Sequence, residues 1–140
     1  MDEIEEETTE ILKWIEKLKI KVASHEKHVR SLSGGNQQRV VIARWLATKP
    51  EILILNCPTV GVDVGSKQEI HQIIRDLAKQ NIGVIVISDD IPELLHTCNR
   101  ALILSKGKIK DEINIADLTE KDIHKMMLDW GDGKWLKNNK

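Results

Sequence analysis

Two short apolar runs that lack alternation constrain the fold of this chain more than any other feature. They are Ile-Leu-Ile-Leu at 52–55 and Val-Ile-Val-Ile at 84–87. Continuous runs of this kind are typical of strands covered on both faces, as in a parallel sheet beneath helices. Between them, residues 66–79 carry isoleucine and leucine at helical spacing, which predicts an amphipathic helix. Strand, helix and strand in this order predict an α/β fold.

Further helices and one hairpin are expected around this unit. The sequence predicts helices at 4–18, 36–48, 91–96 and 118–128, and a hairpin of 101–104 with 108–109. The chain has 140 residues, of which 41% are hydrophobic and 31% charged. It is therefore large enough to bury a core and too apolar to be a disordered chain.

The composition argues against several classes of protein. Four Trp with no Phe or Tyr leave little material for stacking on bases, and a formal net charge of -1 does not suit a phosphate backbone. No apolar run approaches the ~20 residues of a membrane span, and the acidic first residues are the opposite of a signal peptide. Cys57 and Cys98 are too far apart in sequence for a CxxC metal site or a disulfide framework. We expect a cytoplasmic protein that binds no nucleic acid.

A Ser-Gly-Gly turn at 33–35 is the first candidate for a functional site. Because it leads into a predicted helix, it would present backbone N–H groups and a hydroxyl at the positive end of the helix dipole. Glycines let the backbone approach an anion closely. An ordinary serine N-cap followed by two loop glycines would look the same, so the turn alone leaves both interpretations open.

The neighbouring motifs resemble those of ATP-binding-cassette (ABC) ATPases. Leu32 to Arg39 resembles the signature loop of that family, and Asn36-Gln37-Gln38 is similar to its sugar-importer branch. Residues 58–67 resemble the loop after the Walker B strand, with Asp63 at the D-loop aspartate, and residues 87–93 resemble the switch region. The order and spacing of these motifs are those of the family. The switch histidine of many members is missing here, as it often is in the second cassette of the sugar-importer branch, and the chain resembles that second cassette.

The resemblance implies a partial P-loop NTPase fold. The chain would be the C-terminal half of an ABC ATPase domain, with a parallel sheet that lacks its P-loop strand and with part of the helical subdomain. The implied divisions are 1–35 for the helical subdomain remnant and signature loop, 36–130 for the ATPase core, and 131–140 for a flexible tail. We expect a truncated member of the family.

The resemblance also implies which residues contact the nucleotide. In the family the signature loop contacts the γ-phosphate of ATP held by the opposite subunit. Carried over to this chain, the nucleotide-binding residues are Ser33, Gly34, Gly35, Asn36 and Asp63. ATP would be bound only through a partner, and the chain would hold no metal of its own.

Several catalytic positions of the family are altered. No GxxxxGK[ST] sequence occurs in the chain, so nothing cradles the β- and γ-phosphates. Asn56 and Cys57 stand where the family places Asp-Glu, and neither can hold the Mg²⁺ shell or polarise water as a carboxylate does. Asp89 stands where many members carry the switch histidine. A nucleophilic Cys57 is the weaker reading, because a single Cys at a strand end is more often inert. We expect no catalysis by the chain alone.

Two functions remain open. In the first, the chain is a degenerate ATP-binding subunit of a carbohydrate importer that supplies its signature loop in trans. In the second, it is an interaction module, or an inert fragment, that binds no nucleotide. The partners expected are an intact ABC ATPase half or a second copy, and a membrane permease, which would hold the chain at the inner face of the cell membrane.

The expected sheet has an open edge. In the family the strand before the P-loop lies between 84–87 and 101–104, and this chain does not contain it. Either 101–104 moves inward to pair with 84–87, or two copies join edge to edge, or a partner supplies the strand. An apolar, unpaired strand edge is a site of association.

Overall fold

A computed structural model describes residues 3–131 of the chain. These residues form two compact units, the first ending at Ile85 and the second beginning at Val86. The α/β fold predicted from the sequence is confirmed. The divisions after residues 35 and 130 stay a prediction, and all but the first residue of the predicted tail lies outside the described residues.

The first unit contains the predicted strand–helix–strand arrangement. Its elements are α1 (Glu3–Lys17), the 3-10 turn η1 (Val29–Ser31), α2 (Gly34–Leu46), β1 (Ile52–Asn56), α3 (Val64–Lys79) and β2 (Gly83–Ile87), of which the last two residues belong to the second unit. Helices α2 and α3 each begin two residues earlier than predicted. At α3 the reason is Asp63. Its side chain accepts a hydrogen bond from the Ser66 N–H and caps the N-terminus of the helix, which therefore begins at Val64.

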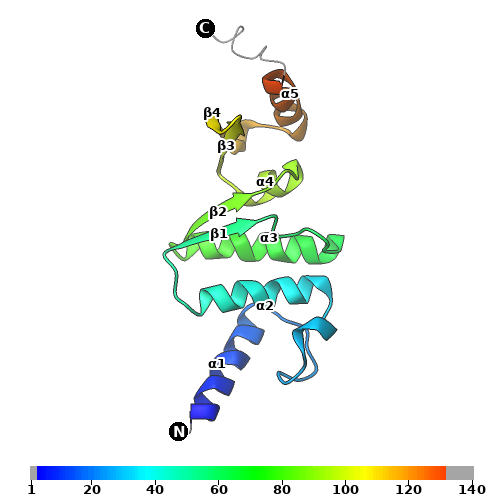
Figure 1. The fold of residues 1–140 in the computed structure, drawn as a ribbon, viewed down its shortest axis with the longest axis vertical. Helices are drawn as coiled ribbons and strands as arrows, with labels where there is room; N and C mark the ends of the chain where they lie inside the picture. Colours follow the sequence, from blue (N-terminus) through cyan, green and yellow to red (C-terminus); the bar gives the residue numbers. More distant parts are fainter. Residues whose placement is uncertain (1–2, 132–140) are drawn as a thin grey trace. The chain divides into compact units, whose positions relative to one another are not determined.

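Helices α2 and α3 lie side by side with their N-termini at the same end (Figure 1). Together with β1 they enclose the core of the unit. The most deeply buried apolar side chains come from both helices and from the strand: Ile42, Leu46, Leu53, Leu55, Ile70, Ile74 and Leu77. Leu18 and Ile20, at the end of α1 and just after it, are also buried.

Strand β1 is covered on one face only, so the expected cover on both faces is wrong. Leu53 and Leu55 are 5% and 7% exposed, whereas Ile52 and Ile54 are 63% and 62% exposed. The helices of the first unit pack on one side, and the alternation of the strand then buries every second residue. The uncovered isoleucines form an apolar face, which continues on β2 at the half-exposed Ile85.

The strands within the described residues pair in two separate two-stranded sheets. Strands β1 and β2 form a two-stranded parallel sheet (Figure 1), which begins where the Gly83 N–H donates to the Glu51 carbonyl at 2.8 Å. In the second unit, β3 (Arg100–Ser105) pairs antiparallel with β4 (Lys108–Asn114) in a sheet of their own. The three alternatives for the edge of β2 stay predictions.

The second unit is built around the predicted hairpin. Its elements are α4 (Ile91–Thr97), β3 (Arg100–Ser105), β4 (Lys108–Asn114), the 3-10 turn η2 (Ile115–Asp117) and α5 (Glu120–Gly131). Lys106 and Gly107 have φ of 50° and 72°, as the favoured two-residue hairpin turn requires. Ile91, Ile113 and Ile123 form its buried cluster. None of the helices between residues 3 and 131 is both long and apolar enough to cross a membrane.

The exposed apolar face of β1 predicts that the isolated chain associates with itself. We expect Ile54→Lys to reduce concentration-dependent association, measured by analytical ultracentrifugation, because it places a charge on this apolar face. The same change should alter the free energy of unfolding by less than ~1 kcal/mol, since the side chain is exposed.

The matched control is Leu55→Ala on the other face of the strand. It should lower the free energy of unfolding by about 2–5 kcal/mol and leave the apolar face in place. Association of Ile54→Lys equal to that of the unmodified chain would show that another surface is responsible.

Candidate functional site

No side chain caps the N-terminus of α2. Ser33 occupies the N-cap position with extended backbone angles, φ -60° and ψ 156°, and makes no side-chain cap hydrogen bond. A serine at this position usually accepts from an amide of the first turn, because the first N–H groups of a helix have no intrahelical partner. Here those N–H groups and the exposed Ser33 lie at the positive end of the helix.

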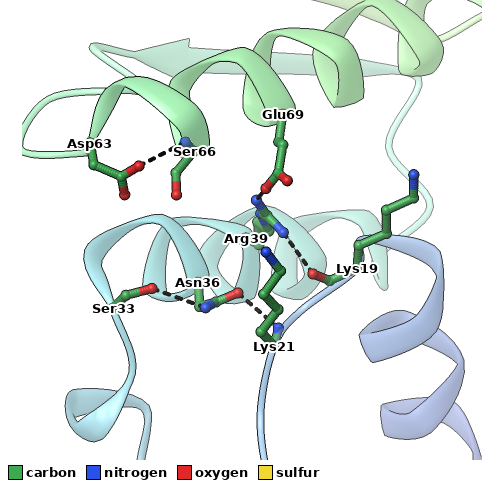
Figure 2. A network of polar contacts seen from close by, with 8 residues as sticks. All are labelled: Lys19, Lys21, Ser33, Asn36, Arg39, Asp63, Ser66 and Glu69. Atoms are coloured by element: carbon green, nitrogen blue, oxygen red, sulfur yellow. Dashed lines mark hydrogen bonds and ion pairs between the residues drawn. The ribbon is translucent and has the colours of Figure 1, made fainter.

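The hydroxyl of Ser33 is instead hydrogen-bonded to Asn36. The Asn36 Nδ2 donates to Ser33 Oγ at 2.9 Å, and the Asn36 Oδ1 accepts from the Lys21 backbone N–H at 2.8 Å (Figure 2). The signature loop is thereby joined to the segment that follows α1. The sequence motif gave no indication of Lys21, which lies 15 residues before Asn36.

Gly34 and Gly35 are required by the packing of this end of α2. A Cβ on Gly35 would lie 2.5 Å from the Ser66 Cβ, and one on Gly34 would lie 3.1 Å from the Gly61 carbonyl oxygen. Residues 33–36 are therefore in close contact with the 61–66 segment, which carries Asp63 (Figure 2). The structure thus brings together all five residues for which the sequence predicts nucleotide binding.

Asp63 acts as the N-cap of α3. Its Oδ1 accepts from the Ser66 N–H at 3.0 Å, and the hydrogen bonds from Ser66 lower the pKa of its carboxyl below the ordinary value. Asp63 is exposed and remains ionised. The terminus of α3 is thus satisfied by its own carboxylate, unlike that of α2.

Arg39 holds α2 against its neighbours. Its side chain is only 3% exposed. One guanidinium nitrogen donates to the Lys19 carbonyl at 2.6 Å and another forms an ion pair with Glu69 on α3 (Figure 2). The hydrogen bond from Arg39, followed by its charge, lowers the pKa of the Glu69 carboxyl.

The sequence prediction missed this ion pair, although a signal was present. Arg39 lies three, four and seven residues before the buried Ile42, Ala43 and Leu46. It therefore stands on the buried face of the helix, and a charge in such a row indicates a buried partner.

The altered catalytic positions lie apart from the signature loop in sequence and stand in different elements. Asn56 is exposed at the end of β1, and Cys57 follows it as a half-buried free thiol with φ of 47°. Asp89 is exposed and belongs to the second unit. Within the described residues no cluster of three His, Cys, Asp or Glu side chains is arranged to hold a metal.

The geometry of the signature loop suits an anion more than a cation. It combines unsatisfied helix N–H groups, a hydroxyl and close backbone approach at two glycines, which is the donor set that binds phosphate at a helix N-terminus. Asp63, on the neighbouring 61–66 segment, caps α3 with its carboxylate.

Sequence comparisons connect the chain with ABC transporters. The ABC transporter family profile matches residues 2–60. The chain is 49% identical over 109 residues to the galactose/methyl galactoside import ATP-binding protein of Vibrio vulnificus, and 47% identical over 109 residues to that of Clostridium perfringens. Each match covers 78% of this chain but only 22% and 21% of the relative. The chain thus spans about a fifth of the length of these relatives.

Solved structures with the same fold are ATP-binding cassettes. A dimeric cassette in a post-hydrolysis state, bound to ADP and phosphate, matches with a TM-score of 0.71 and 28% identity, over 84% of this chain and 50% of that one. A nucleotide-free cassette from an ABC transporter matches with a TM-score of 0.74 and 25% identity, over 89% and 47%. The predicted resemblance to ABC ATPases and the partial ABC ATPase fold are confirmed.

The close contact at Gly35 predicts a large effect of a single methyl group. Gly35→Ala should lower the free energy of unfolding by about 1–3 kcal/mol, because Ser66 or the end of α2 must move. Gly65→Ala is the matched control, since its added Cβ would lie 3.5 Å from Asp63 Oδ1, an ordinary contact. Urea unfolding of both variants tests this, and equal stabilities would contradict the packing argument.

The ion pair of Arg39 with Glu69 predicts a pH-dependent contribution to stability. Because the pKa of Glu69 is lowered in the folded chain, the contribution is present above its ordinary value of 4.5 and is lost as the pH falls through the lowered pKa. Glu69→Gln should therefore destabilise the chain near neutral pH, and the difference from the unmodified chain should shrink as the pH falls below 4.5 and through the lowered pKa of Glu69.

Urea unfolding over that pH range measures the effect. Glu16→Gln, at an exposed position of α1, is the control for removing a carboxylate outside this network. A difference for Glu69→Gln that stays constant with pH would show that the pair does not depend on the ionised carboxylate.

Proposed function

We propose that this chain, which is related to ABC-transporter ATPases in sequence and in fold, supplies its signature loop to an ATP site held by another polypeptide. The assembly would be a carbohydrate importer, because the most similar relatives described above are galactose/methyl galactoside import ATP-binding proteins. The chain would lie on the cytoplasmic side of the membrane, next to a permease.

The observation that carries the proposal is the uncapped N-terminus of α2. A serine stands at its N-cap position, yet the serine side chain makes no cap hydrogen bond. A helix terminus left unsatisfied costs stability, since replacing a cap is worth about 0.5–2 kcal/mol. That cost is offset if the terminus binds an anion when the assembly forms.

The residues of the loop would divide the contacts among them. The Ser33 hydroxyl would donate to an oxygen of the γ-phosphate, and the amides of the first turn of α2 would add backbone N–H groups. Gly34 and Gly35 keep this end of the helix free of side chains. Asp63 would border the phosphate site and orient the 61–66 segment through its bond to Ser66.

The partner must bring what the chain does not contain. No P-loop sequence occurs among these 140 residues, so the cradle for the β- and γ-phosphates would come from a polypeptide that carries one. The partner that fits is therefore an ATPase half with an intact P-loop and Walker B carboxylates. Among the solved relatives, the ADP-bound cassette is itself dimeric.

A second function, that of an interaction module, is favoured by the exposed face of β1. Ile52 and Ile54 are each more than half exposed on the uncovered face of β1. Such a face associates with another polypeptide whether or not nucleotide is bound. Dependence on ATP separates the two functions, because only the signature-loop function requires it.

The absent phosphate cradle predicts that the chain alone does not hydrolyse ATP. Phosphate release by the pure protein with Mg²⁺ should stay well below the ~1 s⁻¹ of slow enzymes. The double variant Asn56→Asp with Cys57→Glu should be equally inactive, since its carboxylates still have no phosphate to act on. Turnover near that rate in either protein would contradict the argument.

ATP-dependent association tests the signature-loop function directly. The chain is mixed with the galactose/methyl galactoside import ATP-binding protein of Vibrio vulnificus, with or without the slowly hydrolysed analogue ATPγS, and the complex is measured by ultracentrifugation. We expect a complex that requires the nucleotide and is weakened about tenfold or more by Ser33→Ala, which removes a hydrogen bond to a charged group.

Association that is equal with and without nucleotide, but lost in Ile54→Lys, would support the interaction module instead. If the chain and the relative do not associate under any of these conditions, neither function holds for this pair.

A further inference from the structure

Asn36 occupies a position between the signature serine and the segment after α1. Both ends of its side-chain amide are engaged, the oxygen with the Lys21 backbone N–H at 2.8 Å and the nitrogen with Ser33 Oγ at 2.9 Å (Figure 2). A contact with nucleotide, as the family resemblance implies for this residue, would have to share or replace one of these two bonds.

The orientation of the Asn36 amide is determined by its backbone partner. A backbone N–H can only donate, so the atom facing Lys21 must be the acceptor oxygen. The amide nitrogen therefore faces Ser33, and because it can only donate, Ser33 Oγ must accept. The hydroxyl hydrogen of Ser33 is then directed away from Asn36.

The segment that sets this orientation is itself held in place. On its other side the Lys19 carbonyl accepts from Arg39 at 2.6 Å, and Arg39 is buried and paired with Glu69. Asn36 and Arg39, both on α2, therefore fix residues 19 and 21 at two points. The buried Ile20 and the bond of Lys19 to Arg39 hold the exposed Lys21 so that its N–H faces the Asn36 amide.

We infer that Asn36 is a positioning residue. Its amide nitrogen donates to the Ser33 oxygen, so the Ser33 hydroxyl hydrogen points away from Asn36 and donates to the phosphate. This inference rests on the proposed function of the signature loop. It assigns Asn36 a role through Ser33, without contact with the nucleotide.

Two substitutions at Asn36 separate positioning from simple structural support. Asn36→Ala removes both hydrogen bonds. Asn36→Asp keeps an acceptor for Lys21 and nearly the same shape, but its second oxygen cannot donate. In that variant the Ser33 hydroxyl must donate to the carboxylate of residue 36, so it no longer donates to a bound phosphate.

The first measurement is made by NMR on the chain alone. In Asn36→Ala we expect the Lys21 amide to exchange with solvent about three- to tenfold faster, as the loss of one hydrogen bond implies. The Ser33 side-chain rotamer, from three-bond couplings, should become averaged. In Asn36→Asp both properties should remain as in the unmodified chain. An unchanged Ser33 rotamer in Asn36→Ala would overturn the inference.

The second measurement is the ATPγS-dependent association with the Vibrio vulnificus relative. Asn36→Asp should weaken it by about the same factor as Ser33→Ala, roughly tenfold. The double variant Ser33→Ala with Asn36→Asp should be no weaker than Ser33→Ala, because the aspartate then has no hydroxyl to redirect. A further loss in the double variant would show that the new charge repels the nucleotide, and would overturn the inference.

The two measurements also separate this inference from the proposed function. If the unmodified chain shows no ATPγS-dependent association, the proposed function fails, and the Ser33 rotamer alone decides whether Asn36 positions the serine. If association is present and Asn36→Asp leaves it unchanged, the proposed function stands and the positioning role is wrong.

Discussion

Arg39 is the residue on which the arrangement of the first unit depends. A buried guanidinium is costly unless its charge has a partner. The two terminal nitrogens of Arg39 have partners that come from two directions, and its buried Nε has none. The Lys19 carbonyl belongs to the segment after α1, and the Glu69 carboxylate belongs to α3. One side chain of α2 thus joins three parts of the chain. The contact between Gly35 and Ser66 completes the alignment, with both helix N-termini at one end.

The two aligned termini differ in a way that matters for anion binding. The α3 terminus is satisfied by the ionised carboxylate of Asp63, whose pKa is lowered by Ser66. At α2 the equivalent residue is Ser33, and its oxygen is turned to Asn36 and away from the helix amides. An anion that approaches this end is therefore repelled by the charge at one helix and attracted by the N–H groups of the other. The pair of helices selects one terminus although their dipoles are parallel.

The helices and strands could be predicted because each follows from local sequence. Which of their faces are buried, and which distant residues pair across them, could not. The apolar run of β1 predicts a strand without knowledge of its neighbours, but only the placement of the helices decides which alternate residues are buried. The site divides in the same way. Ser33 belongs to a contiguous motif. By contrast, Asn36 bonds to Lys21, 15 residues earlier, and Arg39 pairs with Glu69, 30 residues later. Such distant pairs depend on the folded arrangement.

The uncovered isoleucines of β1 also have a consequence for the life of the chain in a cell. Exposed apolar strands aggregate, and chaperones and proteases act on chains that expose them, so a change of about 1–2 kcal/mol in folding stability alters the steady-state abundance of a protein several-fold. With Ile52 and Ile54 exposed in the folded chain, the amount that accumulates in a cell would depend on how far this face is kept from such contacts.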